Sequence, residues 1–103
     1  MVDKAQPMVE GHIQNRILQW LNEQPSCRAV NNHGSNYSGA GEPDVLCCWH
    51  GRLVAIEVKV PGEKPRPLQE WCLQQWAEAG ALAFVACSLD DVKERLSDLL
   101  QPL

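Results

Sequence analysis

Two carboxylates and one ammonium group stand close together in the middle of the chain, among mostly apolar residues. Asp44 opens one apolar run, and Glu57 and Lys59 stand near the end of the next. Because side chains alternate between the two faces of a strand, we expect Glu57 and Lys59 to share a face. Burying such charges is costly without compensation, which a metal ion and a phosphate would supply.

These residue types have the chemistry that phosphodiester hydrolysis needs. Asp44, Glu57 and the backbone carbonyl of Val58 would offer hard oxygen ligands to Mg²⁺ or Mn²⁺, with waters completing an octahedron. Such an ion polarises the scissile phosphate and lowers the pKa of a bound water. Lys59 would orient or help to deprotonate that water and balance charge on the phosphate. The alternatives are that Asp44 is a turn residue after Pro43 and that Glu57 lies on an edge strand with one solvated face.

Two further polar residues lie on the inward stripes of predicted helices. Glu10 stands three residues before Ile13, so it is either an acid favoured at an exposed helix start or a third carboxylate for the metal. Gln69 shares a stripe with Cys72 on a second helix, from which it could contact a phosphate or Lys59. Spacing alone leaves the alternatives open for both residues.

Four other residues are candidates for substrate binding. Lys64 and Arg66 concentrate positive charge just past the Glu57 motif. His33 and Tyr37 lie in a Gly- and Ser-rich segment, residues 33–43, whose composition predicts a loop. Tyr37 could stack on a base or merely hold the loop in place, and a plain loop residue is the simpler interpretation of His33.

The hydrophobic patterns predict an α/β domain with the element order α-β-β-β-α-β-α. A turn at His50-Gly51 joins the second and third strands, and Ser88 is suited to cap the last helix. The helix between the third and fourth strands implies that these two strands are parallel. We expect one domain, residues 1–103, with a mixed central sheet flanked by helices. The expected helices cover residues 8–23, 68–80 and about 89–100, and the expected strands cover residues 27–31, 44–49, 53–60 and 81–87.

Bulk composition narrows the class of protein. The 103 residues are 45% apolar and 21% charged, which is ordinary for a globular domain. No apolar run approaches the roughly 20 residues that span a bilayer, and the first residues lack a hydrophobic signal core, so we expect an intracellular protein and no membrane association. The net charge of −4 argues against a purely electrostatic DNA coat. The five cysteines include no Cys-x-x-Cys pair, so we expect buried free thiols rather than disulfides or zinc.

The order and spacing of the motifs resemble the VRR-NUC family, a branch of the PD-(D/E)xK nucleases. Pro43-Asp44 and Glu57-Val58-Lys59 match the superfamily pattern literally. The resemblance covers about residues 8–87 and implies a restriction-endonuclease-like core. The other matching segments are Glu10-x-x-Ile13-Gln14, Gly41-x-Pro43-Asp44, and Gln69 followed by an apolar helix that ends in Gly80. The site residues that the resemblance implies are Glu10, Asp44, Glu57, Lys59 and Gln69.

The same resemblance implies an activity. Small stand-alone members of the family resemble Holliday-junction resolvases and act as homodimers. We therefore expect a Mg²⁺- or Mn²⁺-dependent DNA endonuclease that prefers branched or structured DNA, in the cytoplasm of a bacterial or virus-infected cell. The alternatives are a non-catalytic nucleic-acid-binding or partner-binding domain on the same fold, and a nickase or exonuclease that needs a partner. One departure is that residues 33–43 carry no Arg or Lys, where a substrate loop is expected to carry some.

Overall fold

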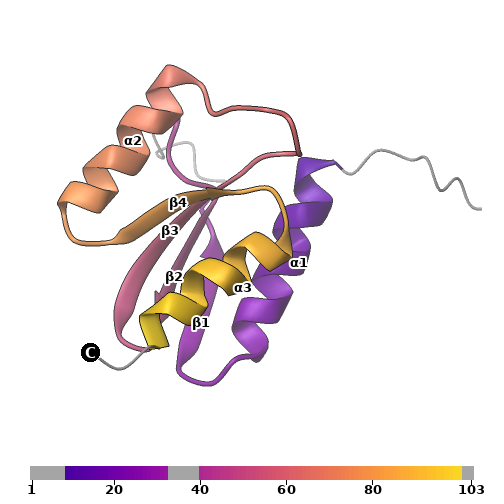
Figure 1. Cartoon of the computed structure of the whole chain (residues 1–103), viewed down its shortest axis with the longest axis vertical. Coiled ribbons are helices and arrows are strands. Elements are labelled where there is room, and N and C mark those ends of the chain that lie inside the picture. The colour runs from indigo at the N-terminus through magenta and orange to yellow at the C-terminus, as the bar shows by residue number, and fades with distance from the viewer. Residues whose placement is uncertain (1–8, 33–39, 101–103) are drawn as a thin grey trace, which may run out of the picture.

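The computed structural model describes residues 9–32 and 40–100 and has an α/β fold built on one four-stranded sheet (Figure 1). The element order is the predicted one, with small differences at the ends. The last helix stops before Leu100 because the chain tightens into a 3₁₀ turn. His33 and Tyr37 lie outside the described residues.

The helices are α1 (Glu10–Glu23), α2 (Pro67–Glu78) and α3 (Leu89–Ser97), followed by the turn η1 (Asp98–Leu100). The strands are β1 (Cys27–Asn31), β2 (Val45–Trp49), β3 (Arg52–Val58) and β4 (Leu82–Ala86).

The sheet is mixed, with the strand order β1-β2-β3-β4. β2 is antiparallel to β1 and β3, whereas β4 runs parallel to β3, as its helical connection predicts. His50 and Gly51 both have positive φ angles, 50° and 86°, which is what a tight two-residue hairpin requires. β3 is therefore a central strand, and the alternative of an edge strand is wrong.

Helices α1 and α3 cover one face of the sheet and bury the main apolar core with it (Figure 1). The apolar stripe of α1 has the helical spacing predicted from the sequence. Ser88 caps α3 as predicted, since its Oγ accepts a hydrogen bond from the Asp91 N–H at 3.1 Å. The buried residues of this core come from α1 (Ile13, Ile17 and Leu21), β3 (Val54, Ile56 and Val58) and α3 (Val92 and Leu96), among others.

Helix α2 covers the opposite face, where the strands that it contacts among the described elements are β3 and β4. Over β1, β2 and the start of β3 this face carries exposed side chains, among them Val30, Cys48 and Leu53. Cys48 corrects the expectation that every thiol is buried, although all five cysteines are free as expected. The two faces of the sheet are thus unequal, because one is fully packed and the other only partly.

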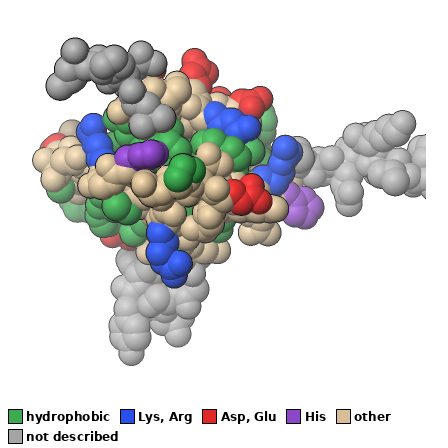
Figure 2. Space-filling view, turned by 90° about the horizontal axis from the view of Figure 1, so that it is seen from below, with side chains coloured by type: hydrophobic (Ala, Val, Ile, Leu, Met, Phe, Trp, Pro, Cys, Tyr) green, Lys and Arg blue, Asp and Glu red, His purple; other side chains and the backbone are tan. Residues whose placement is uncertain are grey.

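The surface carries both signs of charge. On the face seen in Figure 2, basic and acidic side chains are interspersed and no continuous basic band crosses it. This pattern accords with the acidic net charge of −4. Within the described ranges, no helix is long and apolar enough to cross a membrane.

Candidate active site

The antiparallel pairing of β2 with β3 brings Asp44 and Glu57 together. The register pairs Val45 with Ile56, so one step further along Asp44 faces Glu57 and shares its face of the sheet. Only 2% of Asp44 and 0% of Glu57 is exposed. Two carboxylates that are far apart in the sequence therefore lie side by side beneath the surface.

Asp44 is held by backbone contacts rather than by chance placement in a turn. Its Oδ2 accepts a buried hydrogen bond from the Val58 N–H at 2.8 Å, and its carbonyl accepts one from the Asn32 N–H at 2.8 Å. Because β2 begins only at Val45, the Asp44 side chain supplies the acceptor that a longer strand would provide from its backbone. These contacts fix the direction of the carboxylate, so the interpretation of Asp44 as a simple turn residue is inadequate.

The segment before Asp44 is pinned to α2. Gly41 has a φ of +90°, and a Cβ atom there would lie 2.8 Å from Leu68 Cγ and 3.1 Å from the Leu68 backbone. Only glycine accepts both this backbone angle and this approach. One residue later, Glu42 Oε1 accepts a hydrogen bond from Trp76 Nε1 at 3.0 Å. The contacts of the Gly41-x-Pro43-Asp44 motif with α2 therefore hold Asp44 beneath this helix.

Lys59 joins the two carboxylates from the end of β3. Its Nζ lies 3.7 Å from Glu57 Oε2, so the two side chains do share a face. Its backbone N–H donates to the Ala86 carbonyl at 3.0 Å, which continues the pairing of β3 with β4 past the last strand residue. Lys59 is 7% exposed. The formal charges of Asp44, Glu57 and Lys59 sum to −1, a net negative charge in a buried place.

Cys72 lies on α2, the helix that covers this acidic centre. Burial raises the pKa of the Cys72 thiol, and the negative charges of Glu42 and Glu57 raise it further. The Cys72 thiol is therefore close enough to the carboxylates of Glu42 and Glu57 to be affected by their charges. Helix α2 covers the acidic centre, while the apolar core lies on the other side of the sheet.

Gln69 has a local role that the sequence interpretation missed. Its Oε1 accepts a hydrogen bond from the Arg66 N–H at 2.8 Å, which stabilises the first turn of α2. A glutamine three residues after the residue that precedes a helix is a known signal for this contact. Gln69 and Arg66 also line a cavity of about 230 Å³ with Gly41, and Lys64 is exposed in the loop before α2. A contact of Gln69, Lys64 or Arg66 with substrate stays a prediction.

Glu10 is the first residue of α1 and is partly buried. Within residues 9–32 and 40–100, no three His, Cys, Asp or Glu side chains are grouped so as to hold a metal ion. The described structure thus does not join Glu10 to Asp44 and Glu57 in a three-carboxylate cluster, and its part as a third ligand stays a prediction. Asp44 and Glu57 bring two carboxylates together, whose hard oxygens suit Mg²⁺ or Mn²⁺, and the Val58 carbonyl as a further ligand stays a prediction.

Two solved structures share this fold. One, described as "VRR_NUC domain protein", has a TM-score of 0.68 at 20% sequence identity, over 89% of this chain and 88% of the other. The second, described as "VRR_NUC domain", has a TM-score of 0.71 at 24% identity, over 85% of this chain and 94% of the other. No family sequence model matches the chain, and no curated protein is significantly similar in sequence. The chain has the VRR-NUC fold, so the resemblance drawn from its motifs is confirmed at the level of the fold.

Proposed function

We propose that this VRR-NUC fold carries a metal-dependent endonuclease that hydrolyses phosphodiester bonds in DNA. The observation that carries the proposal is the buried meeting of Asp44, Glu57 and Lys59 where β3 ends. A domain this small gains stability from apolar contacts, and it would be expected to place such groups in water unless their proximity served a reaction.

Asp44, Glu57 and the Val58 carbonyl would hold one Mg²⁺ or Mn²⁺. The buried charges favour this, because a divalent cation changes their sum from −1 to +1. When bound, the ion would polarise the scissile phosphate and lower the pKa of a coordinated water. The hydrogen bond from the Val58 N–H to Asp44 Oδ2 restricts the direction in which the Asp44 carboxylate can point.

Lys59 acts on the reacting groups. Its ammonium would orient the attacking water and balance the negative charge that builds on the phosphate oxygens. The Glu57 carboxylate at 3.7 Å and the backbone bond to Ala86 both restrict where this ammonium can lie. Water would attack phosphorus and lose a proton to solvent, the bond from phosphorus to the departing oxygen would break, and that oxygen would take up a proton from solvent.

The substrate that we propose is branched or structured DNA, recognised by shape. The described residues contain no helix-turn-helix or zinc module that would read base edges. A homodimer would present two centres to a two-fold symmetric junction. Support for a dimer comes from exposed apolar side chains, namely Val30 and Leu53 on the open sheet and Leu68 and Trp71 on α2, of which Trp71 is 58% exposed.

The experiment is a cleavage assay on a panel of labelled DNAs. The panel holds linear duplex, single strand, flap, splayed arm and four-way junction, each with Mg²⁺, Mn²⁺ or EDTA. Wild type should cut at least one branched substrate in the presence of metal only, and Glu57→Ala should cut none. Failure of folded wild type to cut any substrate would contradict the proposal and favour a binding domain or an enzyme that needs a partner.

Light scattering on the same preparations tests the dimer. Wild type should have the mass of two chains, and Trp71→Glu should lower it toward one. A monomeric wild type that still cuts a four-way junction would contradict the dimer but leave the nuclease intact.

A further inference from the structure

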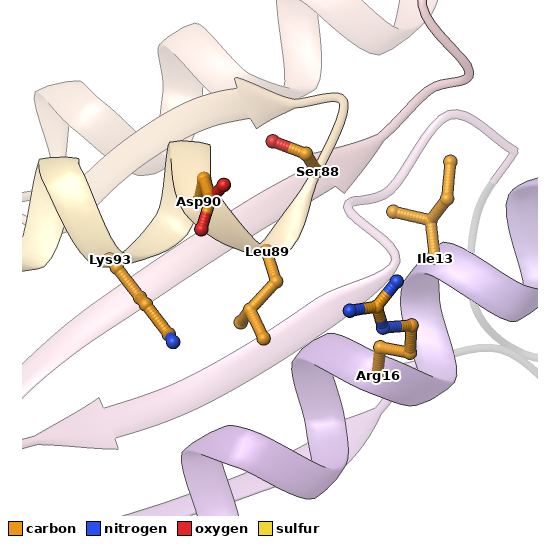
Figure 3. A pocket seen from close by; sticks show the side chains of 6 residues that line it. All are labelled: Ile13, Arg16, Ser88, Leu89, Asp90 and Lys93. Carbon is orange, nitrogen blue, oxygen red and sulfur yellow. The ribbon is translucent and has the colours of Figure 1, made fainter.

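A second charged cluster lies near the acidic centre, on the other face of the sheet. β4 ends at Ala86, whose carbonyl accepts a hydrogen bond from the Lys59 N–H, and Ser88 follows two residues later. Here α1 and α3 leave a cavity of about 180 Å³ between them (Figure 3). The residues that line it are Ile13 and Arg16 of α1 and Ser88, Leu89, Asp90 and Lys93 at the start of α3.

Two cations flank this cavity. Figure 3 shows Arg16 on α1 and Lys93 on α3 on either side of Leu89, with Asp90 near Lys93 on α3. Among the described residues, neither Arg16 nor Lys93 forms a salt bridge, not even with Asp90. The lining therefore carries a formal charge of +1 in a chain whose net charge is −4.

The position of Lys93 is partly set by packing. Its Nζ lies 5.4 Å from the centre of the Trp20 ring, over which the ammonium is attracted by the ring electrons. Both Arg16 and Lys93 are exposed, so an anion could reach them without a change of fold. Two exposed cations from different helices, at one cavity whose lining keeps a positive formal charge, suit the binding of an anion.

A nuclease with this acidic centre needs cations elsewhere on its surface to contact the DNA phosphates. Without a metal the charges of the centre sum to −1, so it repels phosphates, and DNA affinity must come from cations elsewhere. Of the exposed arginines, Arg28 and Arg52 stand toward the far end of the sheet, near the β2–β3 hairpin. The cavity that Arg16 and Lys93 line instead reaches Ser88, two residues after Ala86, whose carbonyl accepts the hydrogen bond from the Lys59 N–H.

We infer that Arg16, Ser88 and Lys93 form a phosphate cradle that holds the backbone of the DNA strand entering the acidic centre. This inference rests on the proposed function and adds to it the surface that supplies affinity. The Ser88 Oγ, which accepts from the Asp91 N–H, can donate its own proton to a phosphate oxygen. The contact reads no sequence, because phosphates are the same at every base.

DNA binding without metal tests the cradle independently of catalysis. Fluorescence anisotropy of a labelled four-way junction in EDTA, at several salt concentrations, would compare wild type with Arg16→Ala/Lys93→Ala. We expect about tenfold weaker binding, and a slope of log affinity against log salt that is smaller by about 2, since two phosphate contacts are lost. The matched control is Arg28→Ala/Arg52→Ala, which removes the same charge from exposed positions and should bind within about twofold of wild type.

The outcomes separate the cradle from the proposed function. Equal weakening in the two double variants would show an effect of net charge alone and overturn the cradle, as would unchanged binding in Arg16→Ala/Lys93→Ala or no binding by folded wild type. If wild type binds through Arg16 and Lys93 but never cuts DNA, the cradle stands and the nuclease falls. If wild type cuts DNA while the variant binds normally, the nuclease stands and the cradle falls.

Discussion

The two faces of β3 are equally buried but differ in what they contribute. Ile56 and Val58 lie in the apolar core beneath α1 and α3, whereas Glu57, between them, turns toward Asp44, Lys59 and the cover of α2. Apolar burial stabilises the fold, but a buried carboxylate opposes folding unless its charge is compensated. One strand thus supports the structure on one side and holds the chemistry on the other, so stability and activity should respond to different substitutions.

The largest expected effect is on the polar face. Lys59→Ala should lower the rate of cleavage on the order of 1000-fold, because the group that orients water and balances phosphate charge is lost. Single-turnover cleavage rates would measure this, with circular dichroism to confirm folding. Arg52→Ala, at the exposed far end of the same strand, should cut at the wild-type rate. Unchanged cleavage by Lys59→Ala would sink the proposed mechanism.

The apolar face should respond in the opposite sense. Ile56→Ala should lower the free energy of unfolding by about 2–4 kcal/mol, because it leaves a cavity in the core. The cleavage rate per folded molecule should stay within about twofold of wild type. Urea denaturation would compare it with Leu53→Ala, which is 40% exposed on the same strand and should cost less than about 1 kcal/mol. A large loss of activity in folded Ile56→Ala would mean that the two faces are not separable.

Asp44 should affect both stability and activity, because it binds the Val58 backbone N–H and is a proposed metal ligand. Asp44→Asn keeps an oxygen that can accept from the Val58 N–H, whereas Asp44→Ala leaves that buried N–H without its partner. Both variants should be inactive, but Asp44→Ala should be less stable than Asp44→Asn by about 1–3 kcal/mol. Equal urea midpoints would show that the hydrogen bond contributes little to stability.

The smallest effect concerns the two faces of β2. Burial raises the pKa of the Cys47 thiol to about 12, with further contributions from Cys27 and Cys48. As the pH rises from about 9 toward 12, the unfolded chain loses this proton first, so stability should fall by no more than about 1.4 kcal/mol per pH unit. Denaturation midpoints from pH 8 to 10 should fall less steeply for Cys47→Ala, and as in wild type for the exposed Cys48→Ala. Identical slopes in all three proteins would assign the change to other groups.

Much of this architecture could be predicted from the sequence, because its signals are local. Alternating and helical apolar patterns gave the element order, and the His50-Gly51 pair gave the hairpin that sets the β2–β3 register. That register is what brings Asp44 opposite Glu57. The parallel pairing of β3 with β4 followed from the helix between them.

The details of the candidate site depend on side-chain contacts that pattern alone does not encode. The sequence placed Gln69 on a stripe that faces the site, but its Oε1 bonds to the start of its own helix. The contact of Asp44 with the Val58 N–H depends on β2 beginning at Val45, one residue later than expected. The close approach of Gly41 to Leu68 arises only when the loop packs against α2, so the sequence pattern alone does not reveal it.

Direct binding of Mn²⁺ tests the central claim that one face of β3 is a metal centre. Isothermal calorimetry would compare wild type, Glu57→Gln and the control Glu42→Gln, which keeps an acceptor for Trp76 Nε1. Wild type and Glu42→Gln should bind Mn²⁺ alike, and Glu57→Gln, folded by circular dichroism, should lose the binding. Unchanged Mn²⁺ affinity in Glu57→Gln would contradict the account.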